Sequence, residues 1–318
     1  MIITVTLNPA VDQTLVLEKL TLGDTNRVRD SRIDPGGKGI NVSRVLRVLG
    51  RESMAAGLAP GSLGRFVEHS LLEQGILCDF VHTRGQTRTN LTVVDESVHE
   101  TTLLSYPGPE ADPRHITTLE TRLRRYLSPG DWLVVAGSIP PSIDVETYAR
   151  LIHLGRQAGA NTVLDADAEA LEAGLTGTPD LVKANHHEAE RLLHCDLESD
   201  DAIIDATHAM RALGPRTAVI TAAGHGAAAV DDESAWWAWP PPTTVVSSIG
   251  AGDSLLAGML MKLEDGANTE EALRWGTAAG AAACLTAGTQ LCSKEEVLRA
   301  VPLVHIEQVR RVEAPSPA

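Results

Sequence analysis

The sequence is poor in aromatic residues and in cysteine. Aromatic side chains make up 3% of its 318 residues, with two Phe, three Tyr and five Trp. Because large rings are so scarce, we expect the helices to pack closely through Ala and Gly. The four cysteines include no C-x-x-C pair. This spacing argues against a disulfide or zinc framework and predicts buried thiols.

Long apolar runs and basic residues are also scarce. No run of 18 or more apolar residues is present, and the first residues, MIITVTLNPAVD, lack a basic segment ahead of an apolar stretch. We therefore expect neither a membrane-spanning helix nor a secretory signal, and we predict a cytoplasmic protein. The formal net charge of −15 argues against binding to nucleic acids or anionic membranes, which needs a basic face. Any anionic ligand must therefore meet a local group of basic side chains.

Short apolar runs rich in β-branched residues alternate with segments of helical character. The runs are IITVTL, WLVVAGS, NTVLDAD, DLVKAN and TAVITAAG. This alternation is typical of an α/β fold with a mostly parallel central sheet and helices on both faces. Helices are expected over residues 40–49, 254–263 and 270–285, and from residue 185 onward.

Two stretches interrupt the alternation, QTLVLEKLTLGDTNRV and RTNLTVVDESVHETTLL. Both alternate with period two, so they can pair into a small sheet that serves as a lid or as an interface between two copies. Edge strands of the main sheet are the alternative. We predict a homodimer through this lid. We also predict how the chain is divided: the α/β core takes residues 1–11, 36–87 and 106–310, the lid takes residues 12–35 and 88–105, and a disordered tail takes residues 311–318.

The stretch SSIGAGDSLLAGML places small residues directly ahead of an apolar helix. Gly250, Ala251 and Gly252 let the backbone turn sharply, and the free N–H groups of the following helix favour an anion in the turn. Asp253 is acidic at a place that attracts anions. It is therefore either a catalytic base beside a phosphate or a residue that caps the helix.

A second glycine-rich turn, PGGKGINVSRVL, also precedes a helix. It lacks the G-x-x-x-x-G-K-[ST] pattern of a Walker A loop, but it places the positive charge of Lys38 inside the turn. Gly37, Lys38 and Asn41 are candidates to bind a hydroxylated or phosphorylated molecule. The alternative is a tight connection in which Asn41 is only a polar residue of the first helical turn. Two such turns in one chain favour a site for two substrates.

Asp12 and Arg88 are further candidates. Asp12 follows a strand that ends at Leu7, and ligands of α/β sheets lie beyond the carboxyl ends of the strands, so Asp12 can bind sugar hydroxyls. Arg88 opens a predicted lid strand and carries the planar donor group suited to phosphate. A turn aspartate and a surface arginine are the alternatives.

The segments KANHHEAE and ITAAGHGAAAV carry the remaining candidates. The first is no H-E-x-x-H zinc motif, because Arg191 stands at the second His position. Asn185 and Glu188 have capping-box spacing, and Glu188 is also a candidate to hold hydrated Mg²⁺. In the second segment, Gly224 and Gly226 let the backbone pass beside a nucleotide, or they form only a hairpin turn.

With these segments in order, the chain resembles the PfkB (ribokinase-like) sugar kinases, most of all their hexose-phosphate branch. The resemblance rests on TLNPAVD, PGGKGINVSRVL, TRTN, AGSIPPS, KANHHEAE and SSIGAGDSLLAGM, and it extends from Met1 to about Val309. It implies a ribokinase-like fold with a β lid. It also implies Mg²⁺-assisted transfer of the γ-phosphoryl group of ATP to a hydroxyl of a sugar phosphate.

The same resemblance implies a role for each matching residue. Asp253 is the base that accepts the proton of the attacking hydroxyl, and Gly250, Ala251 and Gly252 form the anion hole. The other positions fall into three groups: substrate contacts at Asp12, Arg27, Gly37, Lys38, Asn41, Arg88 and Ser138; nucleotide contacts at Lys183, Asn185, Thr221, Gly224 and Gly226; and a magnesium contact through water at Glu188.

The resemblance implies fructose 1-phosphate as the substrate. Tagatose 6-phosphate and fructose 6-phosphate are alternatives, because LLSYPGP lacks the acidic or amide residue that the family commonly has ahead of PGP. A catalytically silent regulator that binds a nucleotide or sugar is an alternative of another class. Such a regulator would need the glycine turns but not the base at Asp253.

Overall fold

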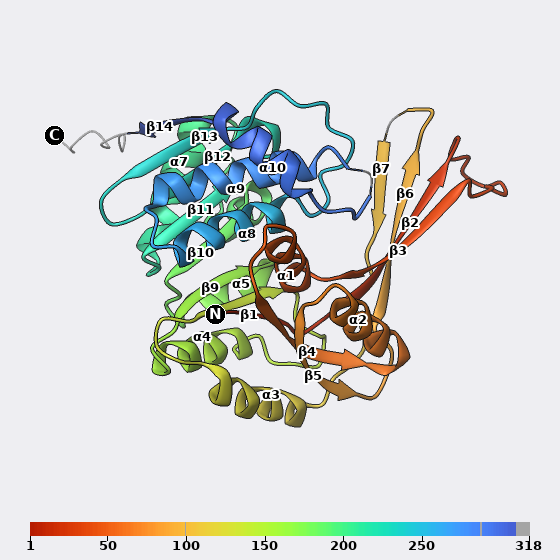
Figure 1. Ribbon diagram of the computed structural model, residues 1–318, viewed down its shortest axis with the longest axis horizontal. Helices are drawn as coiled ribbons and strands as arrows, with labels where there is room; N and C mark the ends of the chain where they lie inside the picture. The colour runs from red at the N-terminus through yellow and green to blue at the C-terminus, as the bar shows by residue number, and fades with distance from the viewer. Residues whose placement is uncertain (99, 287, 310–318) are drawn as a thin grey trace.

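The computed structural model describes residues 1–98, 100–286 and 288–309, so the predicted disordered tail lies outside the described residues. Its main feature is a ten-stranded sheet (Figure 1). In the spatial order given next, the first seven strands pair in parallel and the last three join the sheet by antiparallel pairing. In spatial order they are β5 (Leu77–Thr83), β4 (Ser53–Pro60), β1 (Ile2–Thr6), β8 (Trp132–Gly137), β9 (Asn161–Ala166), β10 (Leu181–Asn185), β11 (Thr217–Thr221), β12 (Ala227–Val230), β13 (Ala235–Trp239) and β14 (His305–Val309).

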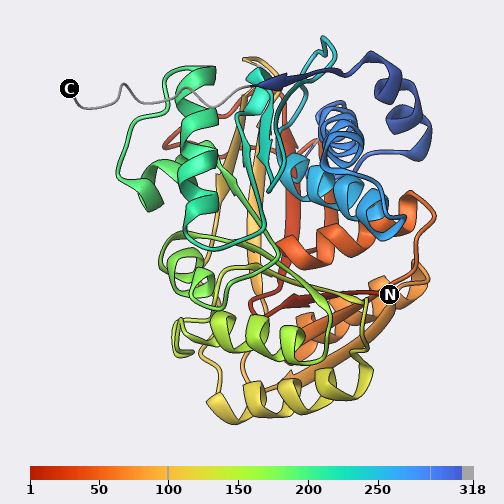
Figure 2. The ribbon, with the colours of Figure 1, turned by 90° about the vertical axis from the view of Figure 1, so that its left-hand side faces the viewer.

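Helices cover both faces of this sheet, as the alternating pattern predicts (Figure 2). One face carries α1 (Lys38–Val48), α2 (Gly61–Glu73), α8 (Ala251–Glu264), α9 (Thr269–Ala283) and α10 (Lys294–Ala300), which leads into the short helix η2 (Val301–Leu303). The other face carries α3 (Pro113–Tyr126), α4 (Thr147–Gln157), α5 (Ala168–Leu175), α6 (His186–Leu193) and α7 (Asp200–Ala212).

Burial on both faces explains why the strands are continuous apolar runs. All residues of β1 are buried. Ile3 and Val5 face the layer of α3 to α7, whereas Ile2 faces the layer of α1 and α8. Burying each such side chain contributes about 1.5–3 kcal/mol, so the two layers hold the sheet from both sides.

Helices α1 and α8 begin earlier than the apolar periodicity predicts. They start at Lys38 and Ala251 rather than near residues 40 and 254. Each is preceded by a glycine with positive φ, Gly37 at 121° and Gly250 at 76°, a conformation that other residues rarely adopt. The two glycine-rich turns therefore lead directly into helix N-termini.

Helices α8 and α9 pack through glycine. A Cβ atom on Gly258 would lie 2.7 Å from the carbonyl oxygen of Trp275, and one on Gly276 would lie 2.5 Å from Cγ of Met259. Neither position can hold a larger residue without moving its neighbours. The expected close packing through small residues is confirmed here.

The cysteines form no disulfide in the described part of the chain, because all four are free thiols. Cys292 is buried, but Cys195 is exposed, so the prediction of a buried thiol is wrong there, because Cys195 follows the end of α6 at the surface. In the described ranges, no helix is both long enough and apolar enough to span a bilayer.

A separate four-stranded sheet projects beyond the main body (Figure 1). Strands β2 and β6 pair in parallel, with Ala10 opposite Arg88 and Leu17 opposite Asp95. The two stretches that interrupt the α/β alternation thus pair with each other, as predicted, and we call this sheet the lid. Its spatial order is β3 (Asp30–Gly36), β2 (Ala10–Leu17), β6 (Arg88–Asp95) and β7 (Glu100–Leu104).

Candidate active site

The carboxyl ends of neighbouring parallel strands bring polar residues to one edge of the main sheet, and three of them were predicted from the sequence. Strands β8, β9, β10 and β11 are adjacent in that order. Ser138 and Asp167 follow β8 and β9, while Asn185 and Thr221 end β10 and β11. This edge is where open α/β sheets bind their ligands.

Asp253 lies in the first turn of α8, directly after the glycine turn. Its side chain is buried, and its Oδ2 accepts a hydrogen bond of 2.8 Å from Nδ2 of Asn41 in the first turn of α1. Burial, followed by the nearby carboxylate of Asp165, raises the pKa of Asp253 to about 6. The cap position of α8 is occupied by Gly250, which has no side chain to cap the helix, and Asp253 lies inside the first turn. The alternative of a helix cap is therefore wrong for Asp253, and its role as a proton acceptor stays a prediction.

A group of lysines and carboxylates lies beside Asp253, and we call it the charge cluster. Its centre is Asp165, which is fully buried and accepts hydrogen bonds from Nζ of Lys38 at 3.0 Å and from Nζ of Lys183 at 2.9 Å. Lys183 is itself 3% exposed. A Cβ atom on Gly252 would lie 2.9 Å from its Nζ, which places this ammonium against the turn that begins α8.

Lys38 connects Asp165 to the other two carboxylates of the charge cluster. Its Nζ donates to Oδ1 of Asp167 and, at 2.9 Å, to Oε1 of Glu188. Burial lowers the pKa of Lys38, but the surrounding carboxylates outweigh burial and raise that pKa well above its usual value. The structure thus pairs Lys38 with carboxylates, and a contact between Lys38 and the phosphate of a sugar substrate remains a prediction.

Glu188 forms the capping box that its spacing suggested, whereas its contact with magnesium stays a prediction. Asn185 and Glu188 form a complete capping box, in which Oε2 of Glu188 accepts from the backbone N–H of Asn185 at 2.7 Å. Its Oε1 belongs to the charge cluster. Burial raises the pKa of Glu188. Burial also raises the pKa of Asp167, but the charge of Lys38 and the hydrogen bonds with Glu188 and Lys38 together outweigh it and lower that pKa. The capping box therefore fixes Glu188 beside a second carboxylate, Asp167.

Arg88 and Ser138 meet at the base of the lid. The Arg88 guanidinium donates to the carbonyl oxygens of Tyr106 at 2.7 Å and Asn8 at 3.1 Å, and to Oγ of Ser138 at 3.2 Å. Among the described residues, Nε of Arg88 is buried without a hydrogen-bond partner. These contacts hold a planar cation at the junction of lid and core, which suits a phosphate.

Asp12 lies within lid strand β2, so the alternative of a turn aspartate is wrong. Its side chain is buried, and Oδ1 accepts from Nδ2 of Asn90 at 2.9 Å. Burial raises the pKa of Asp12. A Cβ atom at Gly36 would lie 2.0 Å from Oδ2, so the glycine of the neighbouring strand makes room for this carboxylate. Asp12, Arg88 and Gly37 therefore lie together where the lid joins α1.

Three of the predicted nucleotide residues, Thr221, Gly224 and Gly226, lie at or just after the end of β11. Thr221 ends that strand, and the short helix η1 (Ala223–His225) joins it to antiparallel β12. Gly226 has φ 136°, and a Cβ atom there would lie 2.4 Å from the carbonyl oxygen of Ala238. No atom lies within 4 Å of the Cβ position of Gly224 in the described part of the chain. Hairpin geometry alone accounts for Gly226, whereas Gly224 faces open space.

Arg27 is not brought to the site within one chain. It lies in the connection between β2 and β3, where the backbone N–H of Arg29 donates to the carbonyl oxygen of Val16. Val16 is six residues along β2 from Ala10, the partner of Arg88. At about 3.3 Å per residue this is roughly 20 Å, so the connection that holds Arg27 lies well away from Arg88 in the same chain.

Sequence reasoning missed two acidic members of the charge cluster, Asp165 and Asp167. Both lie at the carboxyl end of β9 in the run VLDADAE. A strand that ends in two acidic residues at this edge of the sheet is a usable signal, since ligands bind there. Asn90, the partner of Asp12, carried no such signal.

Known proteins show which family this chain belongs to. The pfkB family of carbohydrate kinases matches residues 5–296. The chain is 32% identical to 1-phosphofructokinase of Bacillus subtilis over 97% of this chain and 100% of that protein, and 35% identical to 1-phosphofructokinase of Xanthomonas campestris over 87% and 88%. It is also similar to the solved phosphofructokinase-2 of Escherichia coli in complex with substrates and products, with a TM-score of 0.89 and 31% identity over 95% of this chain and 98% of that chain. The chain is thus a phosphotransferase that belongs to the pfkB family of carbohydrate kinases.

Proposed function

We propose that this kinase transfers the γ-phosphoryl group of ATP to fructose 1-phosphate, giving fructose 1,6-bisphosphate and ADP. One observation carries the proposal: Asp253, with its pKa near 6, hydrogen bonds to Asn41 where two glycine turns begin two helices. A base between two anion-binding turns suits transfer of a phosphoryl group to a hydroxyl. The names of the related 1-phosphofructokinases support the choice of sugar phosphate.

In this reaction the sugar phosphate binds between the lid and α1. Asp12 and Asn41 accept and donate hydrogen bonds to the sugar hydroxyls, while Arg88 and Ser138 hold the phosphate that the substrate already carries. The ionised Asp253 accepts the proton of the attacking hydroxyl as the oxygen bonds to the γ-phosphorus. The bond from that phosphorus to the bridging oxygen breaks, and ADP leaves.

The anion hole and the nucleotide contacts complete the proposed site. The N–H groups that follow Gly250 face the oxygens of the transferred group, and Lys183 adds a positive charge beside Gly252. Thr221 and Gly224 lie at the end of β11, where we place the nucleotide; Asn185 and Gly226 complete the proposed nucleotide contacts. Since the protein consumes ATP and a sugar phosphate, we also propose a cytoplasmic location.

The residues present fit a magnesium ion. In the ranges that the structure describes, no three His, Cys, Asp or Glu side chains form a closed metal cage. Magnesium does not need one, because it binds through one or two carboxylates, several waters and the phosphates of the substrate. Asp167, which is 44% exposed, and Glu188 would hold it directly or through water. When bound, the metal neutralises charge on the phosphate oxygens.

The lid also supports the proposed homodimer. Its apolar side chains include Ile33, Leu103 and Leu104, which are about half exposed at 53%, 49% and 50%. Apolar surface of this kind on a projecting sheet is covered when two copies associate. Arg27, far from the site of its own chain, would then contact a substrate phosphate only in the other copy.

Activity with purified protein tests the proposed substrate. We expect ADP release with Mg-ATP to be fastest with fructose 1-phosphate, by about tenfold or more in kcat/KM over fructose 6-phosphate, tagatose 6-phosphate and free fructose. A preference for one of the other phosphate esters would change the substrate but keep the kinase. No turnover with any of them, from folded protein that binds ATP, would favour the silent regulator.

A further inference from the structure

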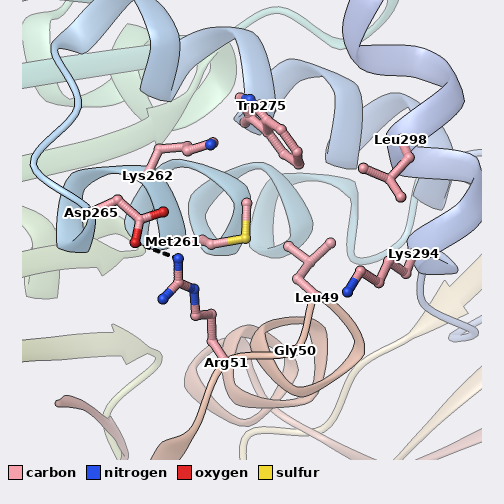
Figure 3. Close-up of a pocket in the computed structure, with 9 residues that line it drawn as sticks. All are labelled: Leu49, Gly50, Arg51, Met261, Lys262, Asp265, Trp275, Lys294 and Leu298. Atoms are coloured by element: carbon pink, nitrogen blue, oxygen red, sulfur yellow. Dashed lines mark hydrogen bonds and ion pairs between the residues drawn. The ribbon is translucent and has the colours of Figure 1, made fainter.

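A pocket of about 340 Å³ lies at the ends of α1 and α8 that are remote from the active site (Figure 3). Leu49 follows α1, and Met261 lies in the last turns of α8. Eight helical residues separate Leu49 from Asn41 and Met261 from Asp253, which is about 12 Å at 1.5 Å per residue. The pocket is therefore distinct from the active site, and we call it the distal pocket.

Basic residues are concentrated in the distal pocket, although the chain has a net charge of −15. Arg51, Lys262 and Lys294 line it, from three different segments of the chain. The sequence contains only five lysines, of which Lys38 and Lys183 belong to the charge cluster. Two of the three remaining lysines therefore converge on this one pocket.

In the described part of the chain, an acidic group forms an ion pair with only one of these three cations. Arg51 forms an ion pair with Asp265, a carboxylate that lines the pocket (Figure 3). Lys262 lies with its Nζ 4.3 Å from the ring centroid of Trp275. Among the described residues, no carboxylate lies within ion-pair distance of Lys262 or Lys294. The pocket thus keeps two unneutralised positive charges.

Helix dipoles do not explain all of these charges. Lys262 lies in the last turn of α8, where a cation is favourable. Lys294, however, is the first residue of α10, where the helix dipole disfavours a cation. Its Nζ lies 3.5 Å from the Cβ position of Gly50, so it points across the pocket toward the end of α1. A role for Lys294 in binding an anion accounts for this placement.

The wall between the cations is apolar. Leu49 and Met261 are buried, whereas Leu298 remains 50% exposed at the rim. Trp275 is fixed by a hydrogen bond of 2.8 Å from its indole N–H to Oε1 of Glu271. An apolar wall with positive charges at its edge matches a ligand that has a small apolar body and an anionic group.

We propose that the distal pocket binds a small organic anion with a compact apolar part, either a phosphate monoester or an ionised carboxylic acid. Its volume is at the low end of the range of about 300–1,000 Å³ for ligand pockets, so the ligand is smaller than a nucleotide. Phosphate or carboxylate oxygens contact Lys262 and Lys294, and the apolar part packs on Leu49 and Leu298.

Fluorine NMR of the full chain labelled with 5-fluorotryptophan tests this proposal at the pocket itself. The Trp275→Phe variant identifies the Trp275 resonance among the five tryptophans. Phenyl phosphate is the probe, and benzyl alcohol is its uncharged counterpart. We expect a saturable shift of the Trp275 resonance with a dissociation constant of about 1 mM or below. Because the readout is local, binding of phenyl phosphate at the active site does not imitate it.

Substitutions separate this binding from a general effect of charge. The double variant Lys262→Ala, Lys294→Ala should bind phenyl phosphate at least about tenfold more weakly, because two charged contacts are lost. The matched control Lys19→Ala removes an exposed lysine of the lid region and should leave binding unchanged. No shift of Trp275, unchanged affinity in the double variant, or equal binding of benzyl alcohol would overturn the proposal.

Discussion

Replacing Asp253 by Asn is expected to lower kcat by roughly 10²- to 10⁴-fold, the usual contribution of a general base. The amide has no charge with which to accept the proton of the attacking hydroxyl. Its oxygen can still accept the hydrogen bond from Asn41, and burial already disfavours the ionised carboxylate. The variant should therefore keep the fold and the affinity for ATP while turnover falls.

A second substitution in the same helix provides the control for Asp253→Asn. Glu264→Gln makes the same chemical change at the other end of α8, where the carboxylate lies 3.6 Å from the N-terminal amine. Steady-state kinetics should show near-normal kcat for Glu264→Gln. Near-normal kcat in Asp253→Asn as well would rule out its role as the base.

Replacing Asp165 by Asn is expected to lower the free energy of unfolding by about 3–5 kcal/mol, the usual cost of removing one partner from a buried ion pair. Asp165 is fully buried between the ammonium groups of Lys38 and Lys183. An asparagine leaves both cations without that charge and turns an N–H group toward one of them. Urea denaturation followed by circular dichroism measures the difference.

Asp167→Asn provides the comparison for Asp165→Asn, because both carboxylates bind Lys38. Asp167 is 44% exposed, so solvent screens its charge and the expected loss is below about 1 kcal/mol. If Asp167→Asn destabilises the protein as much as Asp165→Asn, the burial of Asp165 does not determine the stability of the charge cluster.

Local patterns were sufficient to predict most of the fold. The apolar runs predicted the parallel strands, because strands buried on both faces are apolar throughout. The period-two stretches predicted the lid, since β2 and β6 are covered less completely than the core strands. The glycines before α1 and α8 predicted the turns, because their positive φ excludes most other residues.

Contacts between distant segments could not be predicted in the same way. Lys38 reaches Glu188, which is 150 positions away, and nothing in its local pattern shows which way its long side chain extends. The pairing of Asp165 with two lysines depends on the order of β9 and β10 in the sheet.

The pH dependence of kcat/KM tests most directly whether Asp253 is the base of this kinase. Because burial and Asp165 raise its pKa to about 6, Asp253 is ionised at neutral pH and becomes protonated as the pH falls through 6. The proposed mechanism predicts activity that halves near pH 6 and falls about tenfold per pH unit below it, while circular dichroism shows intact fold. The residual activity of Asp253→Asn should lack this step. A flat profile down to pH 5, or the same step in Asp253→Asn, would contradict the assignment of Asp253 as the base.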